Sequence, residues 1–250
     1  MSATLDAAPQ APAKNPFQRM AGALFAPAET FADIARKPDF LVPLIVFVLI
    51  GYATSIFTVP RLNLDAMLEQ QHEAMRAKNP QLTDKDFESM DRFTIAITKF
   101  MSWIGPLLGI ALLAALAAIV YLAFRLMGGE GTFPQAFSAT LYAWMPMVIF
   151  SIVMTVVIVA RGSWDPTLAA TLVKSNPAFL VDMKAQPALF SLLASLDIFT
   201  IWVLVLFTYG YAAMSRFSRA KSAAIVFTLY FVFVFVKVGF AALAAGMQKS

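Results

Sequence analysis

Two charged side chains of opposite sign stand alone inside long apolar runs of this 250-residue sequence. Asp197 interrupts the run 189–211, and Lys237 interrupts the run 223–245. Each run is long enough to cross a bilayer as a helix, at ~1.5 Å per residue against a hydrocarbon core of ~30 Å. An ionisable group inside such a helix costs on the order of 2.5–3.5 kcal/mol and often marks a pathway or a charge pair.

The two runs are consecutive and joined by a short loop, so we expect them to form antiparallel neighbouring helices. If the first begins near residue 188 and the second ends near 245, Asp197 and Lys237 lie at similar depths, ~13 Å and ~12 Å at the helical rise. The matching depths predict an intramembrane charge pair. One alternative stays open, in which Asp197 caps a helix that starts later and Lys237 extends outward to the interface.

Few other residues suggest chemistry. The sequence has no cysteine, which excludes disulfides, thiol nucleophiles and zinc–thiolate sites. The one histidine, His72, stands beside Glu69 and Glu73, but without a second histidine a solvated helix face is the better interpretation than a metal site. Asp197 is the only carboxylate in the apolar runs, whereas aspartyl intramembrane proteolysis needs two. We therefore expect no metal and no cofactor.

Composition indicates the fold class. Hydrophobic residues make up 60% of the chain and charged residues 14%, against roughly 25% charged residues in soluble domains. We predict an all-α membrane protein, a bundle of five transmembrane helices with short interfacial amphipathic helices. Residues 1–16 are expected to be a disordered tail and residues 17–250 a single domain. The predicted spans are residues 41–59, 102–124, 137–160, 189–211 and 223–245.

Three segments outside these spans have a pattern of their own. Residues 61–99 form the only long extramembrane segment, and its helical pattern runs directly into the second span. Residues 26–37 and 166–184 are amphipathic with prolines at the starts of their helical stretches, so we expect them to lie at the membrane surface, with Phe31 in the head-group region. For residues 26–37, a plain lead-in to the first span remains an alternative.

Glycines and prolines predict how the helices pack and turn. Gly105 and Gly109 lie four residues apart in the second span, a spacing that lets helix backbones approach closely in lipid. Gly128 and Gly129 predict the turn into the third span. Pro146 lies inside that span, where a proline leaves a carbonyl unpaired and predicts a kink.

Three sets of residues together resemble a known family. They are Pro27, Phe31, Ile34, Pro38 and Pro43; Gly128, Gly129, Phe133, Gln135, Phe137, Tyr142 and Pro146; and Leu196, Asp197, Ile198, Phe199, Trp202 and Gly210. Over about residues 24–245 the sequence resembles the bacterial branch of the Yip family, the Ypt/Rab-interacting proteins.

The resemblance implies a single five-span domain with a cytosolic N-terminus, and it supplies no catalytic residues to carry over. Eukaryotic members are linked to Rab GTPases, membrane trafficking and membrane shaping, but the short tail of this chain shows no evident GTPase-binding surface. A raw count of basic residues slightly opposes this orientation, whereas the dense basic group at 216–221 favours it. We therefore expect a multi-pass protein of the inner cell membrane with its N-terminus in the cytosol.

The sequence favours a non-enzymatic membrane protein that organises the membrane or acts as a scaffold. A transporter, channel or export-system subunit is the alternative, because two ionisable side chains lie inside spans, although the sequence shows no obvious inverted repeat. An enzyme is a third hypothesis without a reactive constellation to support it. The expected partners are the lipid bilayer and a membrane protein or a second copy. No basic patch with interleaved aromatic residues suggests nucleic acid.

Overall fold

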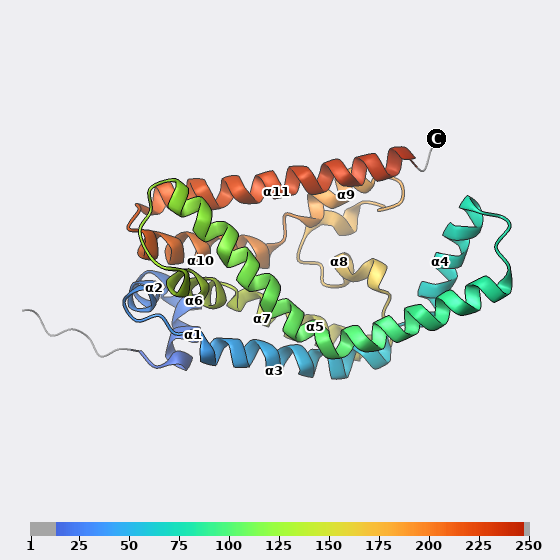
Figure 1. Cartoon of the computed structure of the whole chain (residues 1–250), viewed down its shortest axis with the longest axis horizontal. Helices are drawn as coiled ribbons and strands as arrows, with labels where there is room; N and C mark the ends of the chain where they lie inside the picture. Colours follow the sequence, from blue (N-terminus) through green and yellow to red (C-terminus); the bar gives the residue numbers. More distant parts are fainter. Residues whose placement is uncertain (1–13, 248–250) are drawn as a thin grey trace, which may run out of the picture.

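The computed structural model describes residues 14–247, and its regular structure is helical (Figure 1). In chain order the helices are α1 (Pro16–Phe25), α2 (Pro27–Arg36), α3 (Leu41–Thr58), α4 (Leu64–Lys78), α5 (Asp84–Leu126), α6 (Phe133–Ala143), α7 (Met145–Arg161), α8 (Ala169–Leu172), α9 (Pro187–Ala194), α10 (Ile198–Ser215) and α11 (Arg219–Met247). Short 3-10 helices lie at Val59–Arg61, Pro166–Leu168 and Pro177–Leu180. The described range contains no β-strand, which confirms the all-α class.

Five helical stretches of the described chain are long and apolar enough to cross a membrane, as predicted. They are Leu41–Arg61, Asp84–Leu126, Phe133–Arg161, Ile198–Ser215 and Arg219–Met247. The fourth stretch differs from its expected boundaries, because the apolar run 189–211 is divided between α9 and α10. The structure therefore begins this membrane-crossing helix about nine residues later than the sequence analysis does.

Helix α10 is the centre of the bundle. It packs against α2, α6, α7 and α11, and 56% of its most apolar window is buried, whereas the other four stretches are 11% to 22% buried. Figure 1 shows α11 antiparallel to α10 along one side, α3 along the opposite side and α5 crossing between them. Helices α1, α2 and α6 gather at one end, and α4 and α9 lie towards the other.

Helix α5 continues well beyond a bilayer. Its 43 residues measure ~64 Å at the helical rise, about twice the thickness of the hydrocarbon core. A capping box formed by Thr83 and Asp86 starts it, and α4 folds back on this first part. His72 of α4 hydrogen-bonds to Asp91 of α5 at 2.7 Å, and its ring contacts that of Phe87 at a tilted angle, so the imidazole lies between the two helices. Among the described residues no cluster of ligands suited to a metal is found.

The two segments expected at the membrane surface differ from the prediction. In α2, Phe31 and Ile34 are each 1% exposed and belong to the main apolar core, so Phe31 packs against protein instead of lipid head groups. The reason is that α2 lies across α10 and α6, which cover its apolar face. Residues 166–184 contain two 3-10 turns and the single turn of α8 instead of two amphipathic helices.

Helix α1 was not expected from the sequence. Asn15 accepts a hydrogen bond from the Gln18 amide while the Gln18 side chain accepts one from the Asn15 amide, and Pro16 occupies the first turn. This capping box ends the predicted tail at residue 14, and the remainder of the tail lies outside the described residues.

Candidate functional site

Asp197 and Lys237 lie in a polar cluster with Ser175, Ser195 and Tyr230 at the break between α9 and α10. Asp197 is the N-cap of α10, with an extended backbone and a carboxylate that accepts from the amides of Phe199 at 2.9 Å and Thr200 at 3.2 Å. The Ser175 hydroxyl donates to its second oxygen. A capping residue is non-helical, so Asp197 starts α10, while α9 already ends at Ala194 with Ser195 as its C-cap. This role, which sequence analysis kept as an alternative, explains why the run 189–211 is not one helix.

Lys237 has a different partner. Its ammonium group donates to Ser195 Oγ at 2.9 Å, and the Tyr230 hydroxyl donates to the Ser195 carbonyl. Within the described chain the structure gives no ion pair between Asp197 and Lys237, so the predicted pair is wrong in its direct form. The depth estimate assumed an unbroken helix from residue 188, and the break at 195–197 removes that assumption. Asp197 itself lies in this break, and Lys237 binds Ser195, two residues before it.

An apolar cavity of ~690 Å³ adjoins this cluster, between α5, α10 and α11. Its wall includes Leu116, Val203, Leu204, Phe207, Val226 and Leu229. The polar residues Ser195, Thr200, Tyr230 and Lys237 also line it. Two rim residues, Ile119 and Phe233, are 62% and 61% exposed, so the cavity opens on the outer surface of the bundle. The arrangement is a hydrophobic hollow with a cation beside it.

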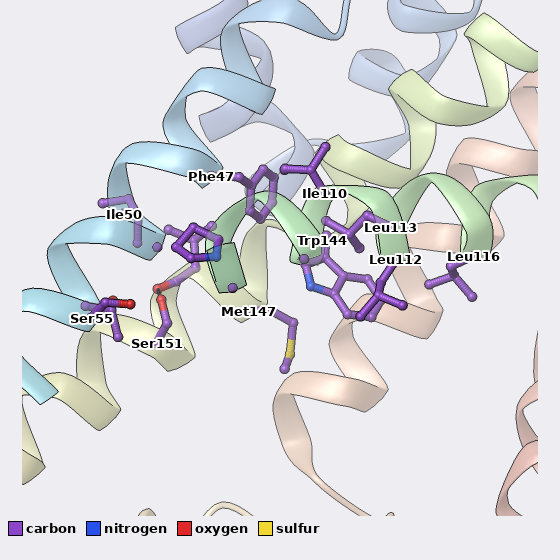
Figure 2. A pocket seen from close by; sticks show the side chains of 16 residues that line it. Phe47, Ile50, Ser55, Ile110, Leu112, Leu113, Leu116, Trp144, Met147 and Ser151 are labelled. Carbon is purple, nitrogen blue, oxygen red and sulfur yellow. Dashed lines mark hydrogen bonds between the residues drawn. The ribbon is translucent and has the colours of Figure 1, made fainter. Parts of the chain in front are cut away.

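A second cavity of ~520 Å³ lies between α3, α5 and α7. Figure 2 shows Phe47 of α3, Ile110 of α5 and Met147 of α7 around it. Gly105 and Gly109 also line this cavity, and a Cβ built on either would meet no atom within 4 Å. The close helix approach predicted at these two glycines is therefore absent from this chain, because α3 and α7 leave a hollow beside them.

Another glycine makes the close contact. A Cβ built on Gly210 of α10 would lie 3.1 Å from both Ala139 Cβ and Phe31 Cδ1. The absence of a side chain at this position lets α2 and α6 pack directly on the central helix. Sequence analysis listed Gly210 only as part of the family resemblance, since its packing partners are distant in sequence.

A turn follows α5 at the two glycines, and the third span is interrupted beside Pro146. Gly128 has a φ of 85°, a conformation that favours glycine, and the Gly129 amide donates to the Phe124 carbonyl at 2.8 Å to close the end of α5. In the third span, α6 ends at Ala143 and α7 begins at Met145, so the helix is interrupted just before Pro146. Pro146 thus occupies the first turn of α7, where its missing amide proton costs little.

A buried ionic network joins the N-terminal helices. Arg19, 2% exposed, donates from Nε to Asp33 at 2.9 Å and from Nη1 to Asp39 at 3.0 Å and to the Lys37 carbonyl at 2.9 Å. The Tyr142 hydroxyl of α6 donates to Asp39, which connects the network to the third span. The sequence analysis missed this network because it did not predict α1, although the Asn15–Gln18 capping pattern signals that helix.

The comparisons with known proteins agree with this architecture. A family model described as the Yip1 domain matches residues 21–241, from within α1 to within α11. The chain belongs to the Yip1 family. The matched range of this Yip1 domain includes the polar cluster and both cavities, and it confirms the predicted resemblance. Comparison with curated proteins and with solved structures gave no match.

The polar cluster of this Yip1 domain is better suited to binding than to acyl transfer. Ser195 and Lys237 have the spacing of a nucleophile and a base, but Ser195 is 4% exposed and its hydroxyl donates to the Ser191 carbonyl at 2.8 Å. The amides of Ser195 and Leu196 both donate to α9 carbonyls, so neither is free to stabilise an oxyanion. The ammonium group of Lys237 keeps further donors, because lysine has three.

Proposed function

We propose that this Yip1 protein is a non-enzymatic organiser of its membrane, acting through lateral contacts with lipids and with neighbouring membrane proteins or a second copy. The observation that carries the proposal is the unequal burial of the spans. In α10, 56% of the most apolar window is buried, whereas the most apolar windows of the other four membrane-crossing stretches are 11% to 22% buried. Few residues in these four windows are thus covered by the protein itself, which leaves them available for contact with whatever surrounds it.

The outward faces carry large apolar side chains on opposite sides of the bundle. On α11, Phe233, Phe235 and Phe240 are 61% to 71% exposed, and on α3, Leu49 and Ile56 are 61% and 68% exposed. Association of helices in lipid is driven by van der Waals packing and not by removal from water. Such faces can therefore bind either acyl chains or the complementary surface of another membrane protein.

The cavities favour an organiser over a transporter of hydrophilic solutes. A pathway for such a solute is lined by polar groups along its length. Here the wall between α5, α10 and α11 is mainly aliphatic and aromatic, with a few polar groups beside it. Asp197 accepts three hydrogen bonds and caps α10, a structural role that needs no proton or ion to pass.

For orientation, we infer a cytosolic N-terminus in the inner cell membrane. Arg216 pairs with Glu130 at 3.0 Å, which joins the basic loop to the turn after α5 at the end where α1 and α2 lie. At the opposite end, the Asn63 amide donates to the Trp164 carbonyl at 2.8 Å and links the segments after the first and third spans. Together with the dense basic group at 216–221, this favours placing α4 outside the cytosol.

Solute flux across vesicles tests the proposal. The full chain would be reconstituted into liposomes that contain trapped pH-, potassium- and chloride-sensitive dyes, and uptake of a set of radiolabelled small solutes would be followed in parallel. We expect rates equal to those of protein-free vesicles. Saturable uptake that Lys237→Met abolishes and the exposed-site control Lys184→Met leaves intact would overturn the proposal and favour a transporter.

A further inference from the structure

Lys237 is a membrane-embedded cation without an acidic partner among the described residues. Its hydrogen bond is to the neutral hydroxyl of Ser195, and the nearby carboxylate of Asp197 is already bound by Ser175 and by two amides of α10. A lysine in this position is expensive unless an anion or water compensates its charge. The Lys237 ammonium therefore needs a negatively charged group beside it to compensate its charge.

The depth of Lys237 along α11 places it close to the head groups of one leaflet. The apolar part of α11 begins at Ala223, after the basic loop, and Lys237 follows fourteen residues later. At the helical rise this is ~21 Å across a hydrocarbon core of ~30 Å. The ammonium group thus lies in the third of the core nearest the end where α9 is found. A lipid head group drawn slightly inward from that leaflet comes within its reach.

The cavity beside Lys237 has the size and lining for an acyl chain. Its ~690 Å³ falls within the roughly 300–1,000 Å³ typical of small-molecule sites. Val203, Leu204 and Phe207 of α10 form an apolar wall that is 3% to 6% exposed. Thr200 also lines the cavity, and the exposed rim at Phe233 leaves an entry from the lipid.

We propose that this cavity binds one anionic phospholipid of the surrounding bilayer. The phosphate oxygens accept from Lys237 Nζ, and one acyl chain lies along the apolar wall formed by α10 and α11. Charge complementarity selects the anionic lipid, since a zwitterionic head group carries its own cation. The inference goes beyond the proposed function and does not depend on it, because an organiser and a transporter can each hold such a lipid.

Native mass spectrometry of the full chain with defined lipids tests the site. Phosphatidylglycerol and phosphatidylcholine with identical acyl chains would be titrated into the detergent-purified protein. We expect phosphatidylglycerol to bind preferentially and Lys237→Met to weaken its binding at least about fivefold, the factor that corresponds to the ~1 kcal/mol a lysine contributes at an anionic lipid surface. Lys237→Arg should retain the preference. Lys184→Met, which removes an exposed lysine, should bind like the wild type.

A second variant tests the cavity without touching the charge. Ala194→Phe adds a ring beside Ser195 inside the hollow and should also reduce phosphatidylglycerol binding at least fivefold, which keeps the test decisive if Lys237→Met does not fold. Equal binding of the two phospholipids by the wild type would overturn the proposal, as would unchanged binding in Ala194→Phe. Binding of oleic acid but not of phosphatidylglycerol would overturn the assignment to a phospholipid.

Discussion

Replacing Arg19 with methionine tests how the N-terminal helices are held on the bundle. Arg19 is 2% exposed and binds the carboxylates of Asp33 and Asp39, whose side chains are 9% and 29% exposed. Methionine keeps much of the apolar stem but removes the charge, so Asp33 is left buried with only the 3.4 Å contact of Arg36. Breaking a buried pair from one side typically costs about 3–5 kcal/mol, because a charge remains without compensation.

The cost should appear as local opening of α1 and α2. The sequence has no cysteine, and Ala23 of α1 is 0% exposed, so Ala23→Cys reports this opening through its rate of thiol labelling. At the lower limit of about 3 kcal/mol, Arg19→Met should raise the rate about 100-fold, since every 1.4 kcal/mol is tenfold. The measurement uses detergent-purified protein and compares variants that all carry the reporter cysteine.

Arg36→Met is the matched control. Arg36 also contacts Asp33, but its side chain is 63% exposed, so its pair should contribute at most about 1 kcal/mol and its loss should change labelling less than tenfold. Adding Asp33→Asn to Arg19→Met should restore part of the protection of the reporter cysteine against labelling, because the unpaired Asp33 carboxylate is then removed. Equal labelling rates in Arg19→Met and Arg36→Met would refute the reasoning.

Two further predictions concern packing and orientation. Gly210→Leu should destabilise the protein by about 1–3 kcal/mol in thermal unfolding, because an added Cβ already lies 3.1 Å from Ala139, whereas Gly109→Leu enters open space and should cost far less; equal losses would contradict the packing described for α10. For orientation, Ser89→Cys should react with an impermeant maleimide in intact cells and Ser218→Cys only after lysis, and the reverse pattern would show that the inferred topology is inverted.

The membrane-spanning helices could be predicted because long apolar runs determine them locally. The first membrane stretch, for example, begins at Leu41 as the sequence indicates, since an apolar run has no other stable state in lipid. Helix α1 is also signalled locally, by Asn15 and Gln18, although the predicted tail ends between these two residues, at residue 16. These elements depend on residues close together in the chain.

The polar cluster could not be predicted in the same way. Asp197 accepts from Ser175, which lies in a loop 22 residues earlier, and Lys237 donates to Ser195, 42 residues away. Depth counting along ideal helices places the two charges opposite each other, but the cap at Asp197 breaks the helix and directs each charge to a different partner. Likewise, the hollow beside Gly109 depends on how α3, α5 and α7 pack together and not on the spacing of small residues.

Photo-crosslinking in native membranes tests the central claim, that the outward faces contact neighbouring proteins, most directly. A photoreactive phenylalanine analogue would replace Phe235 on α11, which is 71% exposed, or Leu49 on α3, which is 61% exposed, with the enclosed Phe207, 4% exposed, as the control. We predict a reproducible protein adduct of defined mass from at least one outward position and none from Phe207. Adducts to lipid alone from both outward positions would contradict lateral assembly with other proteins.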